Sequence, residues 1–469
     1  MNPGGYGGPP GYGPPGGGGY GPPGGGGYGQ PPGGGGYGQP PGGGGYGQPP
    51  GGGGYGQPPG GGGYGQPPGG GGYGQPPGGY GQPARPPAPQ GPPPSAAAGK
   101  EKTLKMIGLI LWIVGCSFGT LVQLWVFLIA PMSSRHAGAI ITAEFIALSF
   151  ALPACLVYMW VPVIIDRFDP EPWWTLMMAF LWGAMAAAGF ACLVNTVMGS
   201  VGEGIGGRVG GEILGAVISA PLVEEGAKAT AVLGMFWFMR REFDGVVDGV
   251  IYATFSALGF AMTENVLYYS HGLLQGDFAF QVLLRGLLKP WGHPLYTAMT
   301  GIGIGIARES TKGWVKLAAP VGFYFIGVTM HACWNASGLL SGLIGVPLIF
   351  VMLPLYFVVL LCFLGIVAWL VAREGRALRK NLEDEVLLGN LTKEELDLIV
   401  SPFGRLKARF GRAGAAGRDF VKAGIRLGMA KWHTARAMQG QKGTISIDSI
   451  LPLRQEMLKL RAQVHAAHR

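Results

Sequence analysis

The sequence predicts an all-α fold: a polytopic transmembrane helix bundle of about eight spans, with a disordered N-terminal tail and a partly helical cytoplasmic C-terminal tail. Three observations predict it. Residues 1–99 consist mainly of Gly, Pro, Tyr and Gln, residues 106–372 are strongly apolar, and the remaining residues are charged. Apolar runs of roughly 20 residues are long enough to cross a bilayer as helices. The chain therefore divides into a repeat tail (1–99), a transmembrane domain (100–372) and a basic tail (373–469).

The N-terminal tail is a low-complexity repeat. Six copies of Gly-Gly-Gly-Gly-Tyr-Gly-Gln-Pro-Pro run from Gly24 to Pro77, and Arg85 is the only charged residue before Lys100. Such a segment cannot bury enough apolar surface to offset the entropy lost on ordering, so we expect it to be disordered. Two interpretations remain, a flexible tether or a weakly self-associating tail in which the regularly spaced tyrosines make the contacts.

The apolar region contains eight candidate spans, of which the sixth is the shortest and is rich in glycine. The segment 278–289 before it is a candidate interfacial helix. The eight candidates are residues 106–129, 136–165, 173–198, 212–239, 248–270, 291–307, 315–338 and 343–372.

The basic residues of the short loops predict the orientation. With the N-terminus inside, nine Lys and Arg residues lie on the cytoplasmic side and four on the opposite side, which satisfies the positive-inside rule. An even number of spans returns the C-terminal tail to the cytoplasm. We therefore expect an integral membrane protein of a bacterial cytoplasmic membrane with both termini cytoplasmic.

Ionisable and amide side chains interrupt four of the apolar runs. Such groups are costly at membrane depth, usually face the interior of a bundle and often mark function. They are Glu224, Glu225 and Lys228 in the fourth span, Glu264 and Asn265 in the fifth, His293 at the start of the sixth, and His331 and Asn335 in the seventh.

Helical spacing brings several of these side chains together. Glu224 and Lys228 are four residues apart and share a helix face, and Glu225 is also within reach of Lys228. His331 and Asn335 share a face in the same way. A lysine beside two carboxylates lowers the cost of burying them. Taken alone, the Glu-Glu-x-x-Lys string is also consistent with a structural ion-pair cluster.

The depth of the polar residues points to one cavity. Counted from the ends of the predicted spans, Glu224, Glu264, His293 and His331 all lie in the outer half of the membrane, at about 1.5 Å per helical residue. A random scatter of polar residues would not share a depth. We therefore expect these four side chains to converge.

The ordered strings resemble those of a known family. Glu224-Glu225-x-x-Lys228, Phe260-x-x-x-Glu264-Asn265, His293 and His331-x-x-x-Asn335 are similar to the motifs of the PrsW family of intramembrane proteases, in a wider superfamily with the type II CAAX prenyl endopeptidases. The resemblance covers roughly residues 106–372. It implies a helical membrane fold with a buried polar site, and cleavage of a membrane-anchored protein substrate in regulated proteolysis of a signalling protein.

Peptide hydrolysis requires an activated water and a stabiliser for the oxyanion. We expect Glu224 or Glu225 to act as the general base, Lys228 to fix the charge of that pair, and His331 with Asn335 to stabilise the oxyanion. Two versions remain open. In one, Glu264, His293 and His331 bind Zn²⁺, a two-His, one-Glu set with an open position for water. In the other, no metal is present and Glu264, followed by Asn265, orients the network.

Two other classes of function remain as alternatives. A membrane transporter or proton-coupled channel would use the buried Glu and His groups as a relay. The spans show no internal repeat, which argues against a transporter. A catalytically inactive scaffold is the third class, and the intact carboxylates and histidines argue against it.

The C-terminal tail is basic. From Arg373 onward it has 19 Lys and Arg against 10 Asp and Glu. Thr392 and Glu395 form a capping box, which predicts that a helix begins there. Residues 403–438 interleave basic and apolar side chains, a pattern typical of a segment at an anionic membrane surface. No nucleic-acid recognition motif accompanies the charge, so we do not expect nucleic-acid binding.

Overall fold

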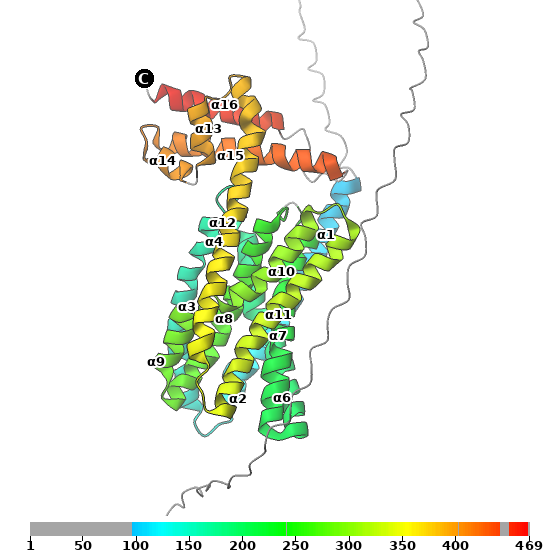
Figure 1. The fold of residues 1–469 in the computed structure, drawn as a ribbon, viewed down its shortest axis with the longest axis vertical. Helices are drawn as coiled ribbons and strands as arrows, with labels where there is room; N and C mark the ends of the chain where they lie inside the picture. Colours follow the sequence, from blue (N-terminus) through cyan, green and yellow to red (C-terminus); the bar gives the residue numbers. More distant parts are fainter. Residues whose placement is uncertain (1–95, 241, 402, 441–449, 468–469) are drawn as a thin grey trace, which may run out of the picture. The chain divides into compact units, whose positions relative to one another are not determined.

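The structure is a computed structural model that describes residues 96–240, 242–401, 403–440 and 450–467. All regular secondary structure within these segments is helical (Figure 1), which confirms the predicted all-α class. The Gly-rich repeat lies outside the described residues. The helices, with π-helical segments labelled η, are α1 (Ala96–Leu124), η1 (Trp125–Ile129), α2 (Ala130–Met132), α3 (Ala137–Tyr158), α4 (Trp160–Ile165), α5 (Trp173–Leu181), η2 (Trp182–Ala187), α6 (Ala188–Gly211), η3 (Glu212–Ser219), α7 (Ala220–Phe238), α8 (Val246–Gln275), α9 (Phe278–Gln281), η4 (Val282–Leu288), α10 (Gly292–Glu309), α11 (Gly313–Ile344), α12 (Ile349–Leu387), α13 (Lys393–Val400), α14 (Gly404–Phe410), α15 (Gly414–Gly440) and α16 (Ile450–Ala466).

The third and fourth predicted spans belong to one 66-residue helical stretch, Trp173–Phe238, that turns back on itself. The backbone is non-helical at Gly206 and Gly207, and Gly207 has a φ of 60°, a left-handed conformation that glycine adopts without strain. The two arms pack closely, because a Cβ atom on Gly202 would lie only 2.3 Å from the carbonyl oxygen of Gly210. The stretch therefore supplies two spans.

The predicted sixth span differs from the others. Six stretches of the described residues are long and apolar enough to cross a membrane, and α10 is not among them, although it is helical over 18 residues. Most of its side chains are buried, so α10 is surrounded by protein rather than by lipid. The eight predicted segments all correspond to helices, but the sixth is a short interior helix. The predicted interfacial segment before it is present as α9 and η4.

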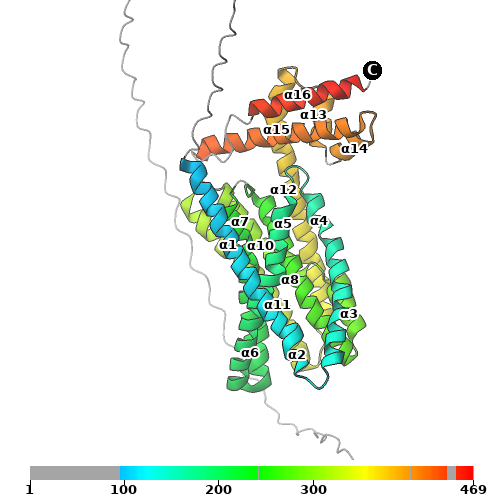
Figure 2. The same ribbon diagram turned by 180° about the vertical axis from the view of Figure 1, so that it is seen from behind.

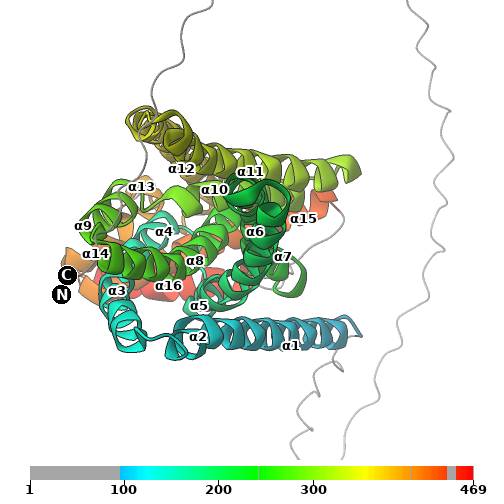
Figure 3. The ribbon, with the colours of Figure 1, turned by 90° about the horizontal axis from the view of Figure 1, so that it is seen from below.

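Helix α8 is the centre of the bundle, with α3, α5, α7 and α10 around it (Figure 3). In its most apolar window 89% of the residues are buried, against 11–44% in the other five stretches. Its contact with α10 depends on two glycines, since a Cβ on Gly249 would lie 2.2 Å from the carbonyl oxygen of Gly301. Small residues allow transmembrane helices to approach in this way. The approach brings the polar faces of α8 and α10 together.

The outer helices expose apolar side chains. Phe145 of α3 is 69% exposed, and Phe350 and Leu361 of α12 are 77% and 68% exposed. Apolar surfaces this extensive are not found on water-soluble proteins. With the six long apolar helices, they identify an integral membrane protein whose outer surface contacts lipid.

The beginning of α1 and the C-terminal half of α12 lie at the same end of the bundle (Figures 1 and 2). Near the start of α1, Lys105 Nζ is 3.9 Å from Glu242 Oε1, in the loop between α7 and α8. In α12, Arg373 Nη1 donates to Glu309 Oε2 at the end of α10 over 2.9 Å. Because both lie at the same end, the chain passes through the bundle an even number of times between the start of α1 and the tail.

The C-terminal tail folds as a compact helical unit. Helix α12 continues through residue 372, the predicted boundary, as far as Leu387. The capping box is confirmed: Glu395 N donates to Thr392 Oγ1 over 3.2 Å, and Thr392 N donates to Glu395 Oε2 over 2.7 Å. The apolar side chains of α15 pack against α12, α13 and α16 in a core that includes Leu378, Leu382, Ile399, Phe420, Val421, Leu427 and Met457. This packing explains most of the amphipathic pattern of residues 403–438.

A histidine of α15 joins the tail to the loops of the transmembrane domain. His433 Nε2 lies 3.0 Å from Asp244 Oδ2 and 3.5 Å from Asp169 Oδ2. Burial alone would lower the pKa of His433, but its ion pairs with the two aspartates outweigh burial and raise the pKa to about 10. The imidazole is therefore cationic at neutral pH and neutralises part of the acidic loop surface.

The contact between α8 and α10 gives a stability prediction. Replacing Gly249 by Ala forces the two backbones apart, and overpacking of this kind typically costs about 1–3 kcal/mol. We expect the G249A protein in detergent to unfold at a lower temperature than the wild type. Gly322 of α11 is the matched control, because a Cβ there would meet nothing within 4 Å. G322A should unfold at the wild-type temperature or above it, and equal losses in both variants would contradict the proposed contact.

Candidate active site

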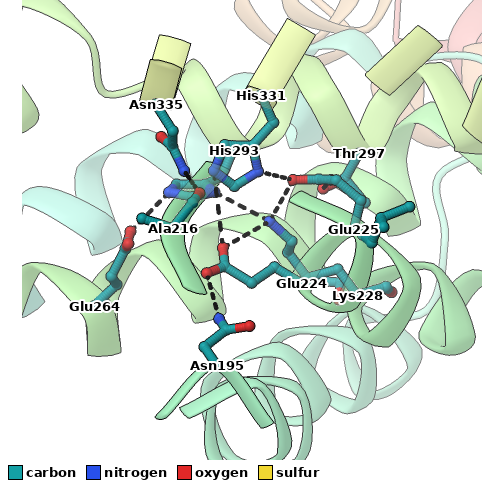
Figure 4. A network of polar contacts seen from close by, with 12 residues as sticks. Asn195, Ala216, Glu224, Glu225, Lys228, Glu264, His293, Thr297, His331 and Asn335 are labelled. Carbon is teal, nitrogen blue, oxygen red and sulfur yellow. Dashed lines mark hydrogen bonds and ion pairs between the residues drawn. The ribbon is translucent and has the colours of Figure 1, made fainter. Parts of the chain in front are cut away.

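The polar strings of four helices meet at one place in the bundle (Figure 4). Glu264 and His331 each lie 18 residues after the first residue of their helix, α8 and α11. His293 lies 16 residues before the end of α10, and Glu224 lies 14 residues before the end of α7. At 1.5 Å per residue these positions are about 21–27 Å from the tail end of the bundle. The residues therefore share a depth, past the midpoint of α8 and α11 from that end.

Glu225 is held by partners on three helices. The side chains of Glu225 and Lys228 are both fully buried, and Lys228 Nζ donates to Glu225 Oε1 over 2.7 Å. The same oxygen lies 3.0 Å from His331 Nδ1 of α11, and Oε2 accepts a 2.7 Å hydrogen bond from Thr297 Oγ1 of α10. Both oxygens of Glu225 thus have hydrogen-bond donors already, in contrast to those of Glu224.

Glu224 keeps one oxygen free. Its Oε1 accepts from Asn195 Nδ2 of α6 over 3.2 Å, while Oε2 is buried and has no hydrogen-bond partner among the described residues. That oxygen lies 4.0 Å from both Lys228 Nζ and His331 Nε2. Buried polar atoms nearly always have a partner, so an unpaired carboxylate oxygen in the centre of a polar cluster indicates a place for a ligand.

Glu264 is bound by Arg285, which lies in the candidate interfacial segment 278–289 and was counted among the four basic residues on the side opposite the cytoplasm. Arg285, in η4, donates from Nη2 to Glu264 Oε2, and its Nε donates to Asn265 Oδ1 over 2.9 Å. Its guanidinium also stacks on Tyr268, 3.6 Å from the ring centre. Arg285 therefore belongs to the site and not to the loops used for the charge count. The sequence did offer one signal for Arg285. It is a charged residue in an apolar segment that lies between two of the intramembrane motifs.

The two histidines are arranged alike. His293 Nε2 is 2.7 Å from Glu264 Oε2, and His331 Nδ1 is 3.0 Å from Glu225 Oε1. In each ring the other nitrogen faces the centre of the cluster, where Lys228 Nζ lies 3.0 Å from His293 Nδ1. A carboxylate on one ring nitrogen is the usual arrangement around metal-ligating histidines, since it fixes the orientation of the ring.

The donor set suits a metal ion. One ligand atom each from Glu224, His293 and His331 lie within 4.8 Å of one another, and all three residues are buried. Two imidazoles and one carboxylate match a catalytic metal site with an open position. This set contains Glu224, whereas the sequence analysis proposed Glu264. In the structure Glu264 supports His293 from the other side.

The balance of charge also favours a cation. The cluster contains three carboxylates, and two of them have a direct cationic partner: Glu225 with Lys228, and Glu264 with Arg285. Glu224 has no partner as close. A buried carboxylate without a counter-charge is costly, so Glu224 needs either a proton or a bound cation.

Asn335 does not face the cluster centre with its amide donor. Its Nδ2 donates to the carbonyl oxygen of Ala216 in η3 over 2.8 Å, which ties α11 to the segment before α7. Asn195, Ser219 and Thr297 were not identified from the sequence as site residues. Ser219 Oγ donates to Asn195 Oδ1 over 2.8 Å and so orients the amide that binds Glu224. No pattern within one helix indicates these contacts, because they form between helices.

Comparisons with known proteins match the region that contains these residues. The model of the PrsW family of intramembrane metalloproteases matches residues 171–364, which include all four strings. A protein named Protease PrsW from Geobacillus kaustophilus is 28% identical over 192 residues, 37% of this chain and 80% of that protein. The Clostridioides difficile protein of the same name is 36% identical over 104 residues, 22% of this chain and 42% of that protein. No solved structure matches the chain significantly.

The matched region contains each residue of the cluster, from Asn195 on α6 to Asn335 on α11, and it lies in a protein with long apolar helices. The order of the motifs, their convergence and the family match thus agree. Residues 171–364 of this integral membrane protein therefore match the PrsW family of intramembrane metalloproteases.

Proposed function

We propose that the protein cleaves peptide bonds of membrane-anchored protein substrates inside the bilayer, in regulated proteolysis of a signalling protein. One observation carries this proposal: the buried, unpaired Oε2 of Glu224 lies 4.0 Å from His331 Nε2, in a group where one ligand atom each of Glu224, His293 and His331 lie within 4.8 Å of one another. A water that attacks a peptide bond needs an acceptor for its proton. The site also lies where a transmembrane or membrane-proximal peptide would reach it.

The residues of the cluster have different proposed roles. Glu225 and Glu264 orient His331 and His293, and Lys228 holds the charge of Glu225. In a metal-free version Glu224, whose Oε2 has no partner among the described residues, is the carboxylate that can accept a proton from water. The Lys228 ammonium lies 4.0 Å from Glu224 Oε2 and is near enough to attract an oxyanion formed there.

Glu224, His293 and His331 would hold the metal ion, which we propose to be Zn²⁺ because zinc favours imidazole and carboxylate ligands in this number. When bound, such an ion acidifies water and polarises a carbonyl group. Around it, Glu264 and Glu225 keep the imidazole nitrogens directed at the centre. In a metal-free version the same geometry leaves Glu224 as a general base assisted by the two rings.

The proposed orientation places both termini in the cytoplasm and the site in the outer half of the membrane. Two features support it. The beginning of α1 and the tail lie at the same end of the bundle. Because Arg285 is part of the site, the basic residues facing the opposite compartment become fewer, and the positive-inside asymmetry grows.

The two adjacent glutamates should respond differently to amide substitution. E224Q removes the free acceptor, and loss of a general base typically costs about 10²–10⁴-fold in rate. Its thermal unfolding should change little, because Oε2 has no partner to lose. E225Q should lose activity and also stability, since breaking a buried ion pair costs about 3–5 kcal/mol.

The assay is cleavage of a membrane-anchored reporter, with thermal unfolding measured on the same preparations. Glu203 of α6 is exposed, and E203Q is the matched control that should cleave at the wild-type rate. Wild-type cleavage by E224Q would remove the proposed role of Glu224.

Metal content separates the two proposed ligand sets. If Glu224 is the ligand, E224Q, H293A and H331A should each lose most of the metal found by elemental analysis of the purified wild type. E264Q should retain metal in excess zinc but bind it about 10–100-fold more weakly, the usual effect of removing a carboxylate that supports a ligating histidine. A wild-type enzyme that is active, metal-free and insensitive to chelators would exclude the metal version.

The orientation is tested with a reporter fused to the C-terminus. Alkaline phosphatase, which is active only outside the cytoplasm, should be inactive there, and a fluorescent protein that folds in the cytoplasm should be bright. Insertion of the same reporters at Gly345, in the turn between α11 and α12, should give the opposite pattern. Active phosphatase at the C-terminus would reverse the proposed topology.

A further inference from the structure

Helix α14 leaves an apolar face without a partner. Phe403, Leu406 and Phe410 are 63%, 53% and 79% exposed. They are three and four residues apart, so they project from one side of the helix. The apolar side chains of α15, by contrast, are packed in the core of the tail. The exposed face of α14 is therefore not explained by the folding of the tail.

A basic pocket of about 470 Å³ adjoins this face. Leu406 lines it together with four basic side chains, Arg405, Arg409, Arg418 and Lys422. The one acidic side chain in the lining, Asp419, is paired with Arg418 over 2.8 Å. The pocket therefore has a surplus of positive charge.

Two of the basic side chains are free to bind a ligand. Arg409 and Lys422 are exposed and form no hydrogen bond or ion pair within the described part of the chain. Arg405 is half-buried and faces Asp166 at the end of α4. The free charges thus lie at the rim, where an anion from outside would approach.

The pocket lies at the level of the bilayer surface. Its lining includes Pro170, in the loop between α4 and α5. Three residues further on, Trp173 begins α5 and is 75% exposed, and Trp174 is 39% exposed. Exposed tryptophans at the end of an apolar helix mark the interface between hydrocarbon and headgroups. The same short loop therefore carries interfacial anchors and a wall of the pocket.

We propose that this pocket binds the phosphate group of an anionic phospholipid of the surrounding bilayer, while Phe403, Leu406 and Phe410 insert among the neighbouring headgroups. An apolar face beside surplus positive charge is the combination that binds anionic membrane surfaces. A nucleic acid would satisfy the charge but would leave the three apolar side chains exposed. The lipid accounts for both features.

The test uses the full-length protein purified in mild detergent. Binding of phosphatidylglycerol and of phosphatidylcholine is measured by native mass spectrometry as each lipid is titrated. We expect a specific site for phosphatidylglycerol that the double variant R409Q/K422Q binds about 30-fold more weakly, the factor for two charges worth about 1 kcal/mol each. The matched control is K393Q/K459Q, which removes two exposed lysines of α13 and α16 that do not line the pocket.

A second measurement tests the apolar face. Hydrogen exchange of residues 403–410 should slow when the protein is moved from phosphatidylcholine nanodiscs into nanodiscs containing phosphatidylglycerol. F403S/F410S should lose this protection and keep its fold, because both side chains are exposed. Equal binding of the two lipids, an equal loss in K393Q/K459Q, or displacement of the lipid by an RNA oligonucleotide would each overturn the proposal.

Discussion

The buried ion pair between Lys228 and Glu225 organises the transmembrane domain. Neither side chain has any exposure, so each charge depends on its neighbours. Lys228 Nζ also lies over the ring of Phe260 on α8, 4.4 Å from its centre, and contacts His293 on α10. Glu225 reaches His331 on α11. Four helices are thus fixed to one pair of charges, and removal of either partner leaves the other unpaired at a depth where this is very costly.

The helices around this ion pair contain glycines and a π-helical segment close to the polar residues. Gly249 and Gly301 let α8 and α10 approach until their polar faces meet. The π-helical segment η3 directly precedes α7, and Pro221 lies in the first turn of α7, one turn before the two glutamates. Wide turns of this kind are frequent near functional sites. The close approach of these helices therefore accompanies the contacts between their polar side chains.

Much of the site follows from spacing along single helices. Glu224 with Lys228, and the common depth of Glu264 and His331, depend on the 1.5 Å rise and the 3.6-residue turn alone. The contact of Arg285 with Glu264 is different, because it depends on how η4 folds back against α8. The sequence analysis expected Glu264 as a metal ligand. In the structure this carboxylate contacts Arg285 and His293, and the group of residues whose geometry could hold a metal ion contains Glu224.

The spans themselves were predictable because their composition is extreme. The reversal at Gly206 and Gly207 lies between the third and fourth predicted spans, but its exact position was not predictable, since glycines are common throughout these apolar runs. In the C-terminal tail, the sequence pattern was read correctly as amphipathic, but the surface that its apolar face contacts was not. Its interleaved basic and apolar residues suggested a segment lying on the membrane, yet Phe420 and Leu427 are core residues of a folded unit. A periodic pattern shows that a face is buried but not what buries it.

Helix α12 gives this unit a mechanical connection to the site. It runs without interruption from Ile349 to Leu387, a rod of about 58 Å at 1.5 Å per residue. Near one end its Tyr356 packs edge-on against Trp334, three residues after His331, and near the other end Leu378 and Leu382 are embedded in the tail. One continuous helix thus joins the core of the tail to α11, the helix that carries the imidazole of His331.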